Sequence, residues 1–145
     1  MCVIIDMNVA HRVLTDRPSP EYDPVHDGLF RQRTLRLAVG GTLRREYFRS
    51  REVTTMLRVL DQAGVARIYD DVVVDAETAT VVGLSQCVSD DPHVIALARV
   101  SGARVICSED KRLHADIKNP RLLRRVGVYQ HVSHSHLLRN VRPCR

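Results

Sequence analysis

The sequence predicts an α/β domain of three layers, in which a mainly parallel sheet of four or five strands lies between helices. Short apolar segments of strand length alternate along the chain with longer segments whose apolar residues have helical spacing. Gly or Pro residues stand at many of the boundaries between these segments. The 145 residues fit one domain, and strands that alternate with helices favour parallel pairing through right-handed crossovers.

The first part of the chain predicts two strands and the helices that follow them. Residues 2–5 are an apolar run that ends in an aspartate, and residues 7–14 form the first predicted helix. The polar, proline-rich residues 15–27 are predicted as a loop or a short helical turn. A second strand is predicted at 36–39, where two glycines end the apolar segment, and Thr42 then offers an N-cap for the next helix.

The middle of the chain predicts two helices separated by a strand. Residues 50–63 are predicted as a helix because apolar residues recur on one face with the spacing i, i+3, i+4 and i+7: Val53, Met56, Leu57 and Leu60. Three consecutive valines predict a strand at 72–74, and the segment 76–86 is predicted as a helix.

The clearest helix of the sequence begins at Asp91. Aspartate is a favoured N-cap residue, Pro92 suits the first helical position, and Gly102 provides the stop. This helix leads directly into a strand predicted at 103–107, so the segment reads as one helix-to-strand connection of a parallel sheet.

The end of the chain predicts one more helix and one more strand, at 110–115 and 126–132. Residues 1–132 therefore form the predicted domain. Residues 133–145 are rich in His and Arg and show no periodicity, which makes this basic tail a candidate for mobility.

The chain is basic, with 22 Lys and Arg residues against 17 Asp and Glu residues and a formal net charge of +5. This charge attracts polyanions such as RNA or DNA, although many proteins without a nucleic-acid role are moderately basic. Aromatic residues are few and Trp is absent, which argues against a single-strand binder that depends on base stacking. Any RNA specificity is therefore expected from backbone geometry and the shape of the cleft.

The four cysteines show no CxxC pairing, and reduced thiols in a cytosolic protein are the simplest interpretation. The first apolar run is too short for the apolar core of a signal peptide. No apolar stretch approaches the roughly 20 residues that a membrane helix needs. The sequence therefore predicts a cytoplasmic protein without a membrane partner.

Four acidic residues fall at predicted strand ends or helix starts: Asp6, Glu46, Asp91 and Asp110. In an open parallel sheet, ligands bind beyond the carboxyl ends of the strands, so these side chains are expected to share one cleft. Carboxylates are ligands of Mg²⁺ or Mn²⁺, and a cation removes the repulsion among them. Each acid also has an ordinary interpretation as a helix cap, a turn residue or a partner of a nearby arginine.

The four acids lie in four ordered motifs: Val3-Ile4-Ile5-Asp6-Met7-Asn8-Val9, Gly41-Thr42-Leu43-Arg44-Arg45-Glu46, Asp91-Pro92-His93-Val94-Ile95-Ala96-Leu97-Ala98 and Val105-Ile106-Cys107-Ser108-Glu109-Asp110. This set resembles the motifs of the PIN-domain nucleases, a family that includes the ribonuclease toxins of bacterial toxin–antitoxin pairs. The resemblance extends from residue 1 to about residue 130 and implies a PIN-like α/β/α domain.

The resemblance implies a metal-dependent endoribonuclease of the toxin or defence type, which hydrolyses RNA phosphodiester bonds. It implies Asp6, Asp91 and Asp110 as principal ligands of Mg²⁺ or Mn²⁺, and Glu46 as a ligand or a water-orienting base. It also implies regulation by an antitoxin-like protein partner and the possibility of a homodimer.

Four further residues are predicted to support this site. Asn8 and Ser108 would hold the carboxylates in their orientation. Helical spacing places Arg45 and Arg49 on one face, where they would contact substrate phosphates or remain a solvated surface. His93 is expected to be a partly exposed helix residue, with a phosphate contact in the cleft as the alternative.

Two other functions compete with the nuclease. A haloacid-dehalogenase-type phosphatase also uses an aspartate at a strand end, but its motif has a second Asp where this chain has Asn8. The other alternative is a non-catalytic module that binds RNA or a protein. A zinc cluster in the tail, formed by His131, His134, His136 and Cys144, is disfavoured because the spacing matches no familiar zinc finger.

Overall fold

The computed structural model of the chain describes residues 1–139 and 142–145. Its centre is a five-stranded parallel sheet with the order β3-β2-β1-β4-β5. The strands are β1 (Cys2–Ile5), β2 (Arg36–Val39), β3 (Ala66–Ile68), β4 (Val105–Cys107) and β5 (Gly127–Tyr129). The predicted α/β class with a parallel sheet is confirmed.

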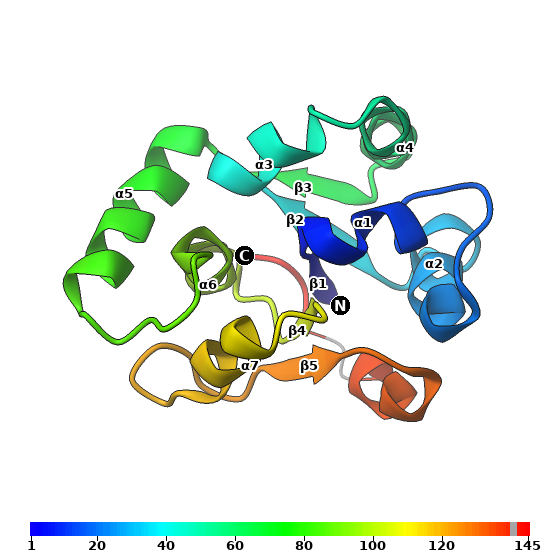
Figure 1. Cartoon of the computed structure of the whole chain (residues 1–145). Helices are drawn as coiled ribbons and strands as arrows, with labels where there is room; N and C mark the ends of the chain where they lie inside the picture. The colour runs from blue at the N-terminus through cyan, green and yellow to red at the C-terminus, as the bar shows by residue number, and fades with distance from the viewer. Residues whose placement is uncertain (140–141) are drawn as a thin grey trace.

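Helices cover both faces of the sheet, as Figure 1 shows. One face carries α1 (Met7–Val13), α2 (Asp23–Phe30) and α4 (Arg51–Gln62), and the other carries α5 (Asp71–Gly83), α6 (Pro92–Ser101) and α7 (Lys111–Lys118). The remaining helices are α3 (Gly41–Tyr47) and the 3₁₀ helices η1 (Pro20–Tyr22) and η2 (Val132–Arg139). All four residues of β1 are buried, as expected for a central strand with helices on both sides. Among the described residues, no helix is both long enough and apolar enough to cross a membrane.

The strand order changes direction at β1. The chain moves outward from β1 through β2 to β3 and then returns to the other side of β1 to form β4 and β5. Ligand crevices of open parallel sheets lie at such a switch point, beyond the carboxyl ends of the strands. Asp6 follows β1, and its backbone N–H donates to the carbonyl of Cys107 in β4 at 2.9 Å. The end of β1 and the end of β4 therefore meet at this crevice.

The strand predicted at 72–74 is wrong, because these valines lie in the first turn of α5. Asp70 is the N-cap of this helix, and its carboxylate accepts a hydrogen bond from the Val72 amide at 2.8 Å. Capping and the packing of Val74, which is buried, outweigh the β preference of the valine run. The third strand lies earlier, in β3.

Two local predictions near α2 and α3 also need correction. The proline-rich segment 15–27 contains the predicted short helical turn, η1, but it also contains the beginning of α2, which continues to Phe30 and was not predicted. Gly40, rather than Thr42, occupies the N-cap position of α3. The Gly41 amide donates to Asp71 Oδ1 at 2.8 Å, so a contact with α5 determines where α3 begins.

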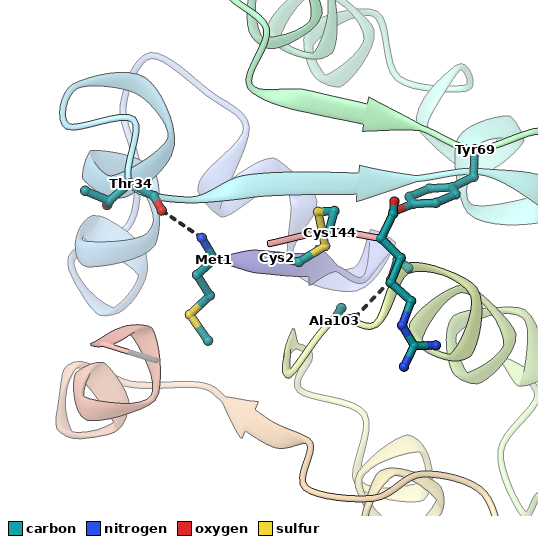
Figure 2. Close-up of a disulfide and its surroundings, with 8 residues drawn as sticks. Met1, Cys2, Thr34, Tyr69, Ala103 and Cys144 are labelled. Atoms are coloured by element: carbon teal, nitrogen blue, oxygen red, sulfur yellow. Dashed lines mark hydrogen bonds between the residues drawn. A yellow bond between two sulfur atoms is a disulfide. The ribbon is translucent and has the colours of Figure 1, made fainter. Parts of the chain in front are cut away.

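The expectation of reduced thiols is wrong for two of the four cysteines. Cys2 and Cys144 form a disulfide with a Cα–Cα distance of 4.8 Å, and they are 142 positions apart in the sequence (Figure 2). Cys107 is a buried free thiol, and Cys87 is a half-buried one. Disulfides are rare in cytosolic proteins, so the cysteines do not support the predicted cytoplasmic location.

The end of the basic tail runs alongside β1 instead of leaving the domain. The Cys2 amide donates to the Arg142 carbonyl at 3.0 Å, and the Arg145 amide donates to the Ser101 carbonyl at 2.9 Å. The Tyr69 hydroxyl donates to the Arg145 carbonyl at 2.7 Å, and Figure 2 shows this ring beside the end of the chain. Residues 132–139 form η2, and residues 140–141 of the predicted tail lie outside the described part.

Candidate metal-binding site

A pocket of about 420 Å³ opens beyond the carboxyl ends of the strands. It is lined by Asp6, Met7, Asn8, Glu46, Arg49, Asp91 and Asp110. All four acids predicted from the sequence thus line one pocket, although they come from the end of β1, from α3 and from the starts of α6 and α7. The parallel sheet explains this convergence, because it directs successive strand ends and helix starts to one edge.

Asp6 is the most deeply buried of these acids, with 4% of its surface exposed. The Ser108 hydroxyl donates to Asp6 Oδ2 at 2.8 Å, and the side-chain Nδ2 of Asn8 donates to the Ser108 hydroxyl oxygen at 3.4 Å. Burial raises the pKa of Asp6, whereas the hydrogen bonds from Ser108 and the Met7 backbone act in the opposite direction. Ser108 therefore holds one carboxylate oxygen of Asp6 directly, and Asn8 reaches that carboxylate only through Ser108.

Asp91 occupies the N-cap position of α6, and Gly102 ends that helix in the left-handed conformation. Its carboxylate nevertheless makes no capping hydrogen bond among the described residues. Burial, followed by repulsion from Asp6, raises the pKa of Asp91 from 3.8 to about 6. The neighbouring Asp90 has a side chain that is 92% exposed. The pocket acid at this position is therefore Asp91, and its oxygens are free of the helix.

His93 is a member of the site that the sequence analysis did not assign. Its Nε2 lies 3.5 Å from Glu46 Oε1, and potential ligand atoms of Glu46, Asp91 and His93 all lie within 4.8 Å of one another. His93 is 5% exposed, so the expectation of a partly exposed residue is wrong. The reason is that α6 packs against the sheet and against α3 and α5. Pro92 was the available signal, because it places His93 in the first turn beside Asp91.

The Nε2 atom of His93 is one of two buried side-chain polar atoms that have no hydrogen-bond partner among the described residues. Such atoms are uncommon in folded proteins, because an unpaired buried donor or acceptor is unfavourable. Nε2 is also an atom through which imidazole binds metals. Together with the nearby oxygens of Glu46 and Asp91, it forms a donor set that fits a divalent cation such as Mn²⁺.

Asp110 has a structural role in addition to its place in the pocket wall. It is the N-cap of α7, and its Oδ1 accepts hydrogen bonds from the amides of Arg112 at 2.9 Å and Leu113 at 3.4 Å. The Asp110 amide donates to the Ser108 hydroxyl oxygen at 3.1 Å. Ser108 therefore connects Asp110 to Asp6 across the switch point.

Arg49 lines the pocket, whereas Arg45 points to another part of the structure. Arg45 Nη2 lies 2.9 Å from Asp75 Oδ1 and also donates to Thr42 Oγ1 at 3.1 Å. The prediction that Arg45 and Arg49 share a helix face is wrong, because α3 ends at Tyr47 and α4 begins at Arg51. Arg45 therefore lies on α3, whereas Arg49 lies in the connection between α3 and α4, and their side chains take different directions.

The histidines near the end of the chain form no second site. Cys144 is part of the disulfide, and the His134 ring packs edge-on against Tyr129 with 6.2 Å between ring centres. Within residues 1–139 and 142–145, Glu46, Asp91 and His93 form the one group of His, Cys, Asp or Glu residues close enough to share a metal ion.

Comparison of the chain with models of protein families, with curated proteins and with solved structures found no match. The structure itself is an α/β fold with a five-stranded parallel sheet, which is compatible with Rossmann-like and PIN folds.

Proposed function

We propose that this protein is a metal-dependent endoribonuclease that acts in the manner of the PIN-domain nucleases it resembles. The observation that carries the proposal is the convergence of four carboxylates in one open pocket. Beside two of them, Glu46 and Asp91, lies His93 Nε2, which has no hydrogen-bond partner among the described residues. Burial, followed by repulsion from Asp6, raises the pKa of Asp91, and a divalent cation in the pocket favours the ionised carboxylate. Caps and turns alone do not account for this arrangement, because the Asp91 carboxylate caps nothing in the described chain.

Glu46, Asp91 and His93 would hold the cation, with Asp6 and Asp110 on the surrounding wall. The imidazole favours Mn²⁺ over Mg²⁺, since Mg²⁺ prefers oxygen ligands. A cation bound there supplies positive charge opposite the phosphoryl oxygens and lowers the pKa of nearby water. Ser108 keeps Asp6 oriented toward the pocket, and Arg49 provides a guanidinium for a substrate phosphate.

The charge of the whole chain supports a polyanionic substrate. Apart from the four acids of the pocket, 13 of the 17 Asp and Glu residues remain, against 22 Lys and Arg residues. The rest of the chain is therefore more basic than the net charge of the whole chain suggests, which favours nucleic acid. RNA in particular follows from the motif resemblance.

An antitoxin-like protein partner, a homodimer and a cytoplasmic location rest on the resemblance and the sequence, and they stay predictions. The phosphatase alternative gains no support, because Asn8 stands where that family has its second Asp. The non-catalytic alternative differs from the nuclease in one measurable property, since it requires neither a cation nor cleavage.

The test is incubation of a labelled RNA with the wild-type protein in Mn²⁺, in Mg²⁺ and in EDTA, beside Asp6→Asn. We expect cation-dependent cleavage by the wild type, a large loss for Asp6→Asn, and products with a 5′-phosphate, because activated water is the nucleophile. A cyclic phosphate product would contradict this mechanism. If no RNA is cut and calorimetry detects no cation binding, the protein is a non-catalytic module.

A further inference from the structure

A second hollow, here called the α4 groove, adjoins the acidic pocket. It has a volume of about 510 Å³ and is lined by Phe48, Arg49, Arg51, Thr54, Thr55 and Arg58. Arg49 lines both the groove and the acidic pocket. The two hollows are therefore neighbours on the surface, one basic and one acidic, with Arg49 between them.

The basic wall of the groove is the exposed side of α4. Arg51 and Arg58 are two helical turns apart and project from one face, about 10 Å apart along the axis. Within the described residues, no carboxylate lies within ion-pair distance of Arg49, Arg51 or Arg58, whereas Arg44 and Arg45 are paired with acids of α5. Three positive charges in this groove therefore remain available for a polyanion.

Phe48 adds an aromatic surface to the groove. Phe48 is 51% exposed, which is unusual because phenylalanine is among the residues most often buried. The guanidinium of Arg44 lies over the ring, 5.3 Å from its centre, and Arg44 is in turn paired with Asp71 at 3.3 Å. These contacts hold the ring in place, and Phe48 stays half exposed, so a ligand can reach it.

We propose that the α4 groove binds single-stranded RNA and leads the strand into the acidic pocket. Arg49, Arg51 and Arg58 contact phosphates, and Phe48 stacks on one base between them. The chain has too few aromatic residues for a binder that depends on stacking alone, so the phosphate contacts supply most of the affinity. The strand is single because a base that stacks on a side chain must first be unpaired. This inference rests on the proposed function where it names RNA as the ligand, and it assigns the side from which the substrate enters.

The test measures the binding of a fluorescently labelled single-stranded RNA by fluorescence anisotropy, in EDTA so that no cleavage occurs. The RNA has about 12 nucleotides, because an OB fold that binds single strands covers roughly 4–16 nucleotides. We expect Arg51→Gln/Arg58→Gln to weaken binding more than tenfold. The slope of the logarithm of the association constant against the logarithm of salt concentration should fall in magnitude by about 1.4, because two phosphate contacts are lost. Phe48→Leu should weaken binding by about tenfold with an unchanged salt slope.

The matched control is Arg121→Gln/Arg124→Gln, which removes two exposed arginines outside the groove and therefore the same net charge. If this control and the groove variant lose affinity equally, binding is a general charge effect and the proposal is overturned. Binding of duplex RNA as tightly as of single strands, with no effect of Phe48→Leu, also overturns it. Thermal unfolding of each variant shows whether the fold is intact.

The outcome is independent of catalysis, because the binding measurement contains no divalent cation. Cation-dependent cleavage together with unaltered binding by the groove variants would reject the groove and keep the nuclease. Groove-dependent binding without cleavage in any cation would reject the nuclease and keep the groove. The two proposals can therefore fail separately.

Discussion

At its amino-terminal end β1 is tied to the rest of the chain, whereas at its carboxyl-terminal end it delivers Asp6 into a pocket of mutually repelling acids. The tied end has the Cys2–Cys144 disulfide, the Cys2 to Arg142 hydrogen bond and a hydrogen bond of 3.0 Å from the terminal amine of Met1 to the Thr34 carbonyl. The open end has raised pKa values at Asp6 and Asp91. The four residues of β1 thus connect two different regions. The contacts at the amino-terminal end stabilise the fold, whereas the acids at the carboxyl-terminal end destabilise it.

The difference indicates what each end contributes. A disulfide and satisfied hydrogen bonds favour the folded state, whereas buried carboxylates without cationic partners disfavour it. A group of side chains that lowers stability in the unliganded protein is typical of a functional site. Substitutions at the two ends should therefore have opposite signatures, with activity lost at one end and stability lost at the other.

The largest effect is expected for Asp91→Asn, with Asp90→Asn as its matched control. Asp91→Asn should reduce the rate of RNA cleavage roughly a hundredfold or more, because a charged group is lost where the cation and the reacting phosphate meet. Asp90 is exposed, so its variant should keep wild-type activity. Initial rates in Mn²⁺ measure the effect. Equal losses in both variants would remove the distinction between the pocket and its surroundings.

The next effect is expected at the tied end. Cys144→Ser should lower the free energy of unfolding by about 2–5 kcal/mol, because the disulfide closes a loop that spans nearly the whole chain. Urea denaturation with and without dithiothreitol measures this: the reductant should destabilise the wild type and leave Cys144→Ser unchanged. Cys87→Ser is the control, since Cys87 is a free thiol. A loss of cleavage activity in folded Cys144→Ser would show that the two ends are coupled.

Cation binding should distinguish His93 from the other histidines. His93→Gln should raise the dissociation constant of Mn²⁺ at least about tenfold, because the change removes a nitrogen ligand. The effect on Mg²⁺ should be smaller, and His11→Gln, which alters an exposed histidine, should change neither constant. Titration calorimetry measures both cations. An unchanged affinity of His93→Gln for Mn²⁺ would limit the site to carboxylates.

The smallest effect concerns pH. The pKa of Asp91 is about 6 in the folded protein and near 3.8 in the unfolded chain, which lacks the burial and the repulsion. As pH rises through this interval, the unfolded chain loses its proton first, so the free energy of unfolding decreases. In EDTA, the stability of the wild type relative to Asp91→Asn should therefore fall between pH 4 and pH 7. Mn²⁺ should reverse this trend at pH 7, because the ionised carboxylate binds the cation. Urea midpoints at both pH values measure the difference, and a rise in EDTA would contradict it.

The features predicted correctly from the sequence depend on residues that are close to one another in the chain. Cys2–Ile5 and Arg36–Val39 are strands because they are short apolar segments bounded by polar or glycine residues. The helix from Pro92 to Ser101 has its start signals, Asp91 and Pro92, and its stop signal, Gly102, at its own ends. Asp6, Asp91 and Asp110 could be proposed because each stands directly after a strand or at a helix start, and a parallel sheet brings such positions to one edge. Glu46 does not follow this rule, because it lies near the end of α3.

The features that were missed depend on contacts between distant segments. The burial of His93 follows from the packing of α6 between the sheet and two other helices, and the direction of Arg45 follows from Asp75 on α5. The disulfide joins positions that are 142 residues apart. Local patterns describe backbone hydrogen bonding and the partition of side chains from water over a few residues, so they carry little information on which side chains meet across the fold.

The sequence by itself determined the parallel α/β class and the positions of four acids at the ends of their elements. Only the tertiary structure decided that His93 lies beside Glu46 and Asp91, and that Arg45 points away from the pocket toward Asp75. It also decided that a disulfide from Cys144 binds the end of the chain to the amino-terminal end of β1. The physical reason is that element formation is governed by neighbours along the chain, whereas the composition of a site is governed by neighbours in space.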